Sequence, residues 1–125
     1  EMLIFLHQER MQWELMQGFA KSLRLEFPDE EGWWVSEAYA TRRAENLDKA
    51  RKVLLEGLTI HYESAIIRYN LACYACLLGN LGKSLDLLKE AGQRDEKYKT
   101  LALEDEDLEL VHEDLIKLGW EKKAV

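Results

Sequence analysis

Small and apolar residues dominate the run Tyr69-Asn70-Leu71-Ala72-Cys73-Tyr74-Ala75-Cys76-Leu77-Leu78-Gly79-Asn80 near the middle of this chain. Together with Ile66 and Ile67 they cover most of the circumference of a helix, and Gly79-Asn80 supplies a stop signal. A helix that is apolar on nearly every side must pack against neighbours on two sides. We therefore expect this helix at the centre of the molecule.

One-sided helices are predicted before and after this central helix. Residues 47–58 carry apolar side chains with i, i+3, i+4 and i+7 spacing, and residues 81–91 repeat that pattern before Gly92, a plausible C-terminal cap. The whole chain of 125 residues has one Pro and seven Gly, which is too few turn residues for an all-β protein. The sequence predicts an all-α fold.

An offset of 34 residues aligns the chain with itself. It places Glu45-Asn46-Leu47-Asp48-Lys49-Ala50 over Gly79-Asn80-Leu81-Gly82-Lys83-Ser84, Leu54 over Leu88, Glu56 over Glu90, Gly57 over Ala91 and Ala38 over Ala72. A shared Asn-Leu-x-Lys motif and small residues that recur at one offset indicate an internal repeat with two helices per unit.

This period and this residue pattern resemble those of the tetratricopeptide repeat (TPR) family. The motif positions are occupied in one unit by Trp34, Glu37, Ala38, Thr41, Ala50, Leu54, Gly57 and Tyr62, and in the next by Arg68, Leu71, Ala72, Ala75, Ser84, Leu88, Ala91 and Glu96. The resemblance implies a short, right-handed stack of antiparallel helix pairs in which small residues allow close helix contacts.

We predict a single helical-repeat domain over residues 1–125. It comprises a degenerate N-terminal unit (residues 1–30), two TPR units (31–64 and 65–98) and a C-terminal capping segment (99–125). The N-terminal unit should form one nearly continuous helix over about residues 3–26, because no turn residue interrupts it. The C-terminal part should hold a short helix over residues 95–103 and a closing helix over 105–118 with a polar face. Trp13 and Trp120 are expected to anchor the terminal helices, and Trp33 and Trp34 to pack inside.

The charge of the chain restricts its partners. There are 17 Lys and Arg against 24 Asp and Glu, which gives a formal net charge of −7. This charge repels nucleic-acid backbones and acidic membrane surfaces, and no apolar run approaches the roughly 18 residues that a membrane span needs. We expect a soluble, cytoplasmic protein that binds neither nucleic acid nor membrane. Two cysteines without a disulfide framework favour a reducing compartment.

Two clusters with chemical potential are predicted to be structural. Cys73 and Cys76 have the Cys-x-x-Cys spacing of zinc and redox sites, but they lie in mid-helix and without paired histidines, so packing as small apolar residues is the favoured interpretation. The acidic run of residues 104–109 lacks the glycine of a calcium loop, and we interpret it as a loop and helix start. No nucleophile, base or phosphate loop stands out, so the sequence predicts no enzyme, metal or cofactor.

The TPR resemblance implies a concave groove lined by the first helix of each unit. Its predicted residues are Val35, Tyr39, Arg42, Arg43, Ile66, Tyr69, Asn70, Cys73 and Leu77. Asn70 matches an asparagine of the carboxylate-clamp type, but its cationic partners are missing, so a clamp is disfavoured and a hydrogen bond to the inter-unit turn is the alternative. Arg42 and Arg43 either meet an acidic partner or complement a helix C-terminus.

These features predict a non-catalytic protein–protein interaction module that holds a peptide or a partner helix. The alternative is a self-associating, chaperone-like or regulatory subunit whose stack is completed by further copies of itself, because about three repeats is near the minimum for stability.

Overall fold

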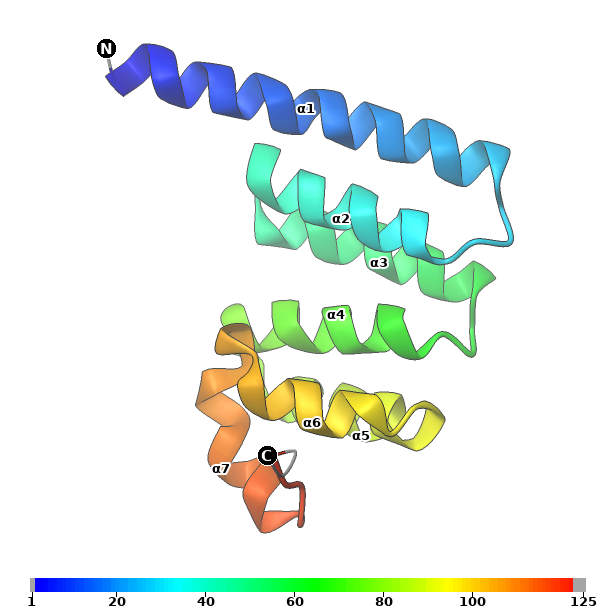
Figure 1. Cartoon of the computed structure of the whole chain (residues 1–125), viewed down its shortest axis with the longest axis vertical. Coiled ribbons are helices and arrows are strands. Elements are labelled where there is room, and N and C mark those ends of the chain that lie inside the picture. The colour runs from blue at the N-terminus through cyan, green and yellow to red at the C-terminus, as the bar shows by residue number, and fades with distance from the viewer. Residues whose placement is uncertain (1, 123–125) are drawn as a thin grey trace. The chain divides into compact units, whose positions relative to one another are not determined.

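The computed structural model describes the backbone of residues 2–122 and the side chains of residues 7–122 (Figure 1). These residues contain no β-strand and are 81% helical, which confirms the all-α prediction. The helices pack as sequence neighbours. Their bounds are α1 (Met2–Glu26), α2 (Gly32–Ala44), α3 (Leu47–Ile60), α4 (Ala65–Leu77), α5 (Leu81–Arg94), α6 (Lys97–Glu104), the 3-10 helix η1 (Glu106–Val111) and α7 (His112–Lys117).

The chain divides into two compact units, Glu1–His61 and Tyr62–Val125. Unit 1 holds α1, α2 and α3, and unit 2 holds the remaining helices. The division falls three residues before the repeat boundary predicted after residue 64. The single-domain organisation stays a prediction.

Unit 1 is built on α2, which packs against α1 and α3. Trp34 is buried, and a Cβ on Gly57 would lie only 2.9 Å from two ring carbons of that tryptophan. Ala38 and Ala50 are fully buried as well. The small residues of the predicted repeat therefore lie where helices approach most closely.

The N-terminal helix is continuous, as predicted. It ends at Glu26, two residues before Pro28, because the residue that precedes a proline is driven out of the helical region. Trp13 packs edge-on against Tyr39 of α2, and Ala20 is buried, so one side of α1 faces α2 (Figure 1). Trp33, predicted to pack inside, is only half-buried, and its indole Nε1 donates a hydrogen bond to Glu30.

Unit 2 is built on α4, the predicted central helix. Nine of its thirteen residues are buried, and Ser64 caps its first turn by accepting a hydrogen bond from the Ile67 amide. The helix ends at Leu77, and the turn that follows contains Gly79, whose φ of 88° lies in the left-handed region that favours glycine. Ser84 of α5 donates to the carbonyl of Ala72, so a small polar residue joins the two helices of the pair.

The C-terminal part differs from the prediction in two ways. Gly92 is not a cap, because α5 continues to Arg94; a Cβ on Gly92 would lie 3.2 Å from both Lys99 and Trp120, so close packing explains the glycine. The single closing helix predicted over residues 105–118 is instead η1 followed by α7. Three turns per nine residues place i and i+3 on one side of a 3-10 helix, which lets Leu108 and Val111 both point into the core.

Candidate functional site

The unit 1 part of the predicted groove lies on the last three turns of α2. Val35, Tyr39 and Arg42 follow one another with i, i+4 and i+7 spacing, so they share a side of the helix. Tyr39 is the most accessible of these three, with 43% of its surface exposed, whereas Val35 and Arg42 are half-buried. Arg42 and Arg43 lie in the last turn of α2, where their charges complement the helix dipole.

Arg43 belongs to a cluster with two residues of α1. Its guanidinium lies over the Trp13 ring at 5.1 Å, and its Nη2 lies 3.0 Å from a carboxylate oxygen of Glu9. Glu9, Arg10, Trp13 and Arg43 line a hollow of about 190 Å³. Glu9 therefore partly neutralises the basic pair Arg42-Arg43. Trp13, which the sequence predicts only as an anchor of the terminal helix, also forms an aromatic side of this hollow.

The unit 2 part of the predicted groove lies along α4, where its five residues form a single stripe. The middle of this stripe is buried: Tyr69 and Cys73 are only 7% and 3% exposed. Ile66 and Asn70 are half-buried, and Leu77 is 40% exposed. Ile66, Asn70 and Leu77 therefore form the accessible part of the α4 face.

Asp105, directly before η1, is the residue that covers this stripe. Its carboxylate accepts a hydrogen bond of 2.8 Å from the Tyr69 hydroxyl and a longer one, 3.6 Å, from the Cys73 thiol. The other carboxylate oxygen accepts the Asp107 amide at 3.0 Å and so caps η1. Burial, with the nearby negative charge of Asp105, raises the pKa of the Cys73 thiol, which keeps the thiol protonated as a hydrogen-bond donor.

Cys73, Asp105 and Asp107 bring a thiol and two carboxylates within 4.8 Å of one another. Among the described residues this is the one group with the number and spacing of ligand atoms for a metal ion. A metal would have to displace the thiol proton and compete with the η1 cap for Asp105. We therefore assign the group to holding η1 against α4. Cys73 and Cys76 are both unpaired and buried, which fits the predicted packing role.

Asn70 does not tie an inter-unit turn, contrary to the prediction. Its side-chain amide donates to the carbonyl of Ile66, one turn back in the same helix, at 2.9 Å. This local bond leaves the amide oxygen as an acceptor on the α4 face.

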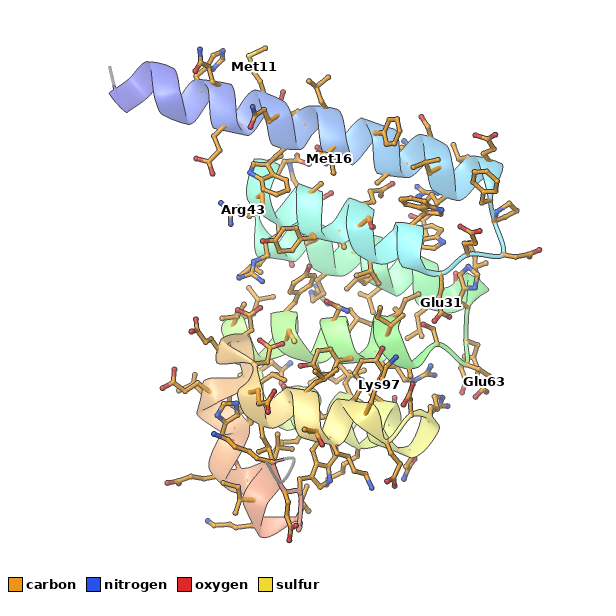
Figure 2. All side chains as sticks on the ribbon, in the orientation of Figure 1. Met11, Met16, Glu31, Arg43, Glu63 and Lys97 are labelled. Carbon is orange, nitrogen blue, oxygen red and sulfur yellow. The ribbon has the colours of Figure 1, made fainter. Side chains whose placement is uncertain are left out.

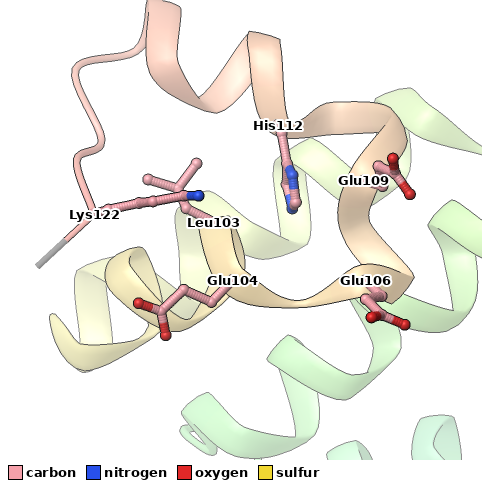
Figure 3. A pocket seen from close by; sticks show the side chains of 6 residues that line it. All are labelled: Leu103, Glu104, Glu106, Glu109, His112 and Lys122. Atoms are coloured by element: carbon pink, nitrogen blue, oxygen red, sulfur yellow. The ribbon is translucent and has the colours of Figure 1, made fainter.

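The acidic run lines a hollow of about 520 Å³ at the C-terminal end of unit 2 (Figure 3). Glu104, Glu106 and Glu109 surround it, and the His112 ring nitrogen Nε2 lies 3.1 Å from the carbonyl of Asp105. Glu106, Asp107 and Glu109 occupy the start of η1, so the run is a loop followed by a helix start, as predicted. A second hollow of about 380 Å³ lies beside the α4 stripe and is lined by Tyr69, Leu101, Glu104 and Asp105.

Sequence reasoning missed an exposed apolar surface on α1. Met11, Leu15, Met16 and Phe19 are all at least 49% exposed, and Figure 2 shows Met11 projecting from the side of α1 that faces away from α2. Gln12, Leu15, Met16 and Phe19 line a shallow, mainly apolar hollow of about 520 Å³. The spacing of these residues along the helix was the signal that would have revealed the surface.

Comparison with known proteins assigns no relative: no family model matches the chain, and no curated protein or solved structure shows a significant match. Within residues 2–122, no helix combines the length and the apolar character needed to cross a bilayer.

Proposed function

We propose that this protein is a non-catalytic interaction module of the TPR type, which binds a peptide or a partner helix through the exposed faces of α2 and α4. The observation that carries the proposal is the recurrence of one helix pair at the 34-residue period. The second helix of each pair begins at Leu47 and at Leu81, and each is capped by an asparagine, Asn46 or Asn80, that accepts the amide of a lysine three residues on. Shared cap chemistry at one offset supports a true repeat rather than accidental spacing.

The accessible residues of the two faces define the chemistry of the partner. The α2 face offers Tyr39 and the Arg43 cluster, and the α4 face offers Asn70 and Leu77. An extended peptide or a helix with apolar side chains and a few polar groups suits each of these faces. Tyr69 and Cys73 do not contact the partner in this proposal. They donate hydrogen bonds to Asp105 and so hold the turn beside the α4 face in place.

The test is capture of partners from a native cell extract with three forms of the chain. The double variant Tyr39→Ala with Asn70→Ala should lose a captured protein, with binding of that purified protein weakened at least tenfold and helicity by circular dichroism unchanged. The control variant, Leu110→Ala with Ile116→Ala, truncates two side chains of unit 2 that are 68% and 60% exposed and lie outside both faces, and it should bind normally. Equal capture by the wild type and the Tyr39/Asn70 variant would reject the proposal.

The cellular compartment is part of the same proposal. Two unpaired cysteines support a reducing, cytoplasmic setting. The self-associating subunit is the second candidate, and the exposed surface of α1 is the observation that favours it.

A further inference from the structure

The exposed side of α1 carries a heptad pattern that runs through five turns of the helix. Steps of three and four residues alternate along this side, as in the seam of a coiled coil. All six residues of this α1 seam are exposed and none is charged. They are Gln8, Met11, Leu15, Gly18, Ser22 and Leu25.

The α1 seam and its edge expose a large apolar surface. Leu15 and Leu25 are 73% and 66% exposed, Met11 is 49% exposed, and Phe19 at the edge of the seam is 64% exposed. Together these side chains present on the order of 500 Å², the size of patch that usually marks an interaction site. Figure 1 shows α2 along one side of α1 and no further helix of unit 1 on the other.

The charges on α1 allow two copies of this chain to meet there. The helix holds three acidic residues (Glu9, Glu14, Glu26) and three basic ones (Arg10, Lys21, Arg24), so 3 − 3 leaves no net charge, whereas the whole chain carries −7. Two copies of a strongly acidic protein repel each other over most surfaces. At α1 this repulsion is absent, and the opposite charges of Glu14 and Lys21, which flank the seam, favour a second copy as its occupant.

We propose that two copies of this chain associate through their α1 helices as an antiparallel pair, related by a twofold axis between Met16 and Gln17. A twofold interface must be self-complementary, and in this register each core residue i of the seam faces core residue 33 − i of the other copy, while residues that flank the core pair with their own counterparts. Leu15 then faces Gly18 of the second copy, Met11 faces Ser22, and Gln8 faces Leu25. In each of the two central layers a large side chain meets a small one, which allows close approach of the helices.

Gly18 and Ser22 have properties that suit such a contact. Glycine in mid-helix is destabilising relative to alanine, and nothing within 4 Å of a Cβ at Gly18 requires its small size inside the chain. The Ser22 hydroxyl donates to the carbonyl of Gly18 at 3.1 Å. Because that hydroxyl has a partner in its own helix, burying Ser22 leaves no unsatisfied donor.

The edges of the α1 seam are complementary in the same register. In an antiparallel pair, residues just before the first core position of each heptad face their counterparts, and these are Glu14 and Lys21. Each Glu14 meets Lys21 of the other copy, which gives two opposite-charge contacts per dimer. Lys21 makes no ion pair among residues 7–122, and Glu14 pairs only with the exposed Arg10.

The edge of the α1 seam opposite Glu14 and Lys21 also gains contacts in the dimer. Phe19 of one copy faces Gln12 of the second, next to the hollow of about 520 Å³ lined by Gln12, Leu15, Met16 and Phe19. The seam is about 26 Å long at 1.5 Å per residue, which places the buried area near the lower end of specific interfaces. We expect a dissociation constant on the order of 1–100 µM.

Sedimentation equilibrium over a wide range of concentration tests the proposal. The wild type should pass from monomer to dimer, and Leu15→Lys and Gly18→Leu should each weaken dimerisation at least tenfold. Gly18→Leu also raises helix propensity, so loss of the dimer cannot be attributed to a damaged monomer. The matched control is Ile60→Lys, which changes another aliphatic residue that is 59% exposed, on α3. A wild type that stays monomeric at all concentrations overturns the proposal, as does unchanged dimerisation of both variants.

A charge exchange and a cross-link test the register. Lys21→Glu should weaken the dimer, and the double variant Glu14→Lys with Lys21→Glu should restore it; failure of restoration contradicts the register. Gln8→Cys mixed with Leu25→Cys should form a disulfide between copies, whereas Gln8→Cys alone should not. A disulfide between two Gln8→Cys copies would demonstrate a parallel pair and overturn the antiparallel arrangement.

The dimer does not depend on partner binding by α2 and α4. Leu15→Lys should weaken dimerisation at least tenfold and still capture the partner, whereas the Tyr39→Ala, Asn70→Ala variant should dimerise normally and lose the partner. Failure of one proposal is thus distinguishable from failure of the other.

Discussion

Trp34 in unit 1 and Arg68 in unit 2 occupy equivalent positions of the 34-residue repeat, but they are stabilised by different chemistry. Trp34 packs against Gly57, and the guanidinium of Arg24 lies 3.9 Å above its ring. Arg68 lies over the Tyr62 ring instead and donates to the carbonyls of Tyr62 and Ser64. Each helix pair therefore surrounds a buried guanidinium, supplied by α1 in one unit and by α4 in the other.

The acidic partners of the two arginines differ in burial. Arg24 Nε lies 2.8 Å from Glu37, and the two side chains are 11% and 8% exposed. Arg68 Nε lies 3.1 Å from Glu90, whose side chain is 48% exposed. A buried ion pair depends on both partners, because removing one leaves an uncompensated charge away from water. An exposed carboxylate is screened by solvent and contributes much less. The same helix geometry therefore accommodates a strong electrostatic dependence in unit 1 and a weak one in unit 2.

The largest expected effect comes from breaking the ion pair of unit 1. Glu37→Gln keeps the shape of the side chain but leaves Arg24 buried without a counter-charge, so the free energy of unfolding should fall by about 3 kcal/mol. Urea denaturation followed by circular dichroism measures the loss. The matched variant in unit 2, Glu90→Gln, should cost less than about 1 kcal/mol, because Glu90 is screened by solvent and the buried Arg68 keeps its hydrogen bonds to the carbonyls of Tyr62 and Ser64. Equal losses in the two variants would show that burial of the acid does not set its importance.

The second expected effect is a loss of stability at alkaline pH, confined to unit 2. Burial, followed by the neighbouring Cys73 thiol and the hydrogen bond to Asp105, raises the pKa of Tyr69, and burial with Asp105 raises that of Cys73. An unfolded thiol ionises near pH 8.5, whereas the folded one stays neutral, so the free energy of unfolding falls as pH rises above that value. The thiol should account for about 2 kcal/mol between pH 8 and pH 10.

Urea denaturation at a series of pH values measures this dependence. The stabilisation is fully present below about pH 8, because neither state is then ionised at Cys73. Cys73→Ala should be less stable at neutral pH but should show a shallower alkaline decline. The same slope in the variant and the wild type would contradict the assignment to the thiol.

The fold was largely predictable from the sequence, because its determinants are local. The i, i+3, i+4 stripes, the turn residues between them and the small residues at one offset predicted α2 to α5 closely, and the absence of turn residues predicted the length of α1. The candidate site was less predictable. Tyr69 and Cys73 are covered by Asp105, which lies more than thirty residues later, and no local pattern indicates which side of a helix a distant turn will cover. The α1 seam is readable in principle, because its spacing of three and four residues is a local pattern.

Two glycines should respond with opposite signs to the same substitution. Gly57→Ala places a Cβ 2.9 Å from the Trp34 ring, and this overpacking should exceed the gain in helix propensity, for a net loss of about 1–2 kcal/mol. Gly18→Ala adds a methyl group in open space and should stabilise the monomer by up to about 1 kcal/mol. Thermal unfolding at low protein concentration compares the two. A loss at both sites would mean that Gly18 is required inside the chain.

The smallest expected effect concerns the two equivalent helix caps. Asn46 and Asn80 each accept the amide of the third following residue, at 2.9 Å and 3.3 Å. Removal of an N-cap side chain leaves one amide without its partner and typically costs about 1 kcal/mol. Asn46→Ala should cost slightly more than Asn80→Ala, because its bond is shorter and because the Asn80 backbone amide is also fixed by the carbonyl of Ala75. Amide hydrogen exchange at Lys49 and Lys83 measures each cap separately. Unchanged exchange at both amides would show that the asparagine caps do not fix the starts of α3 and α5.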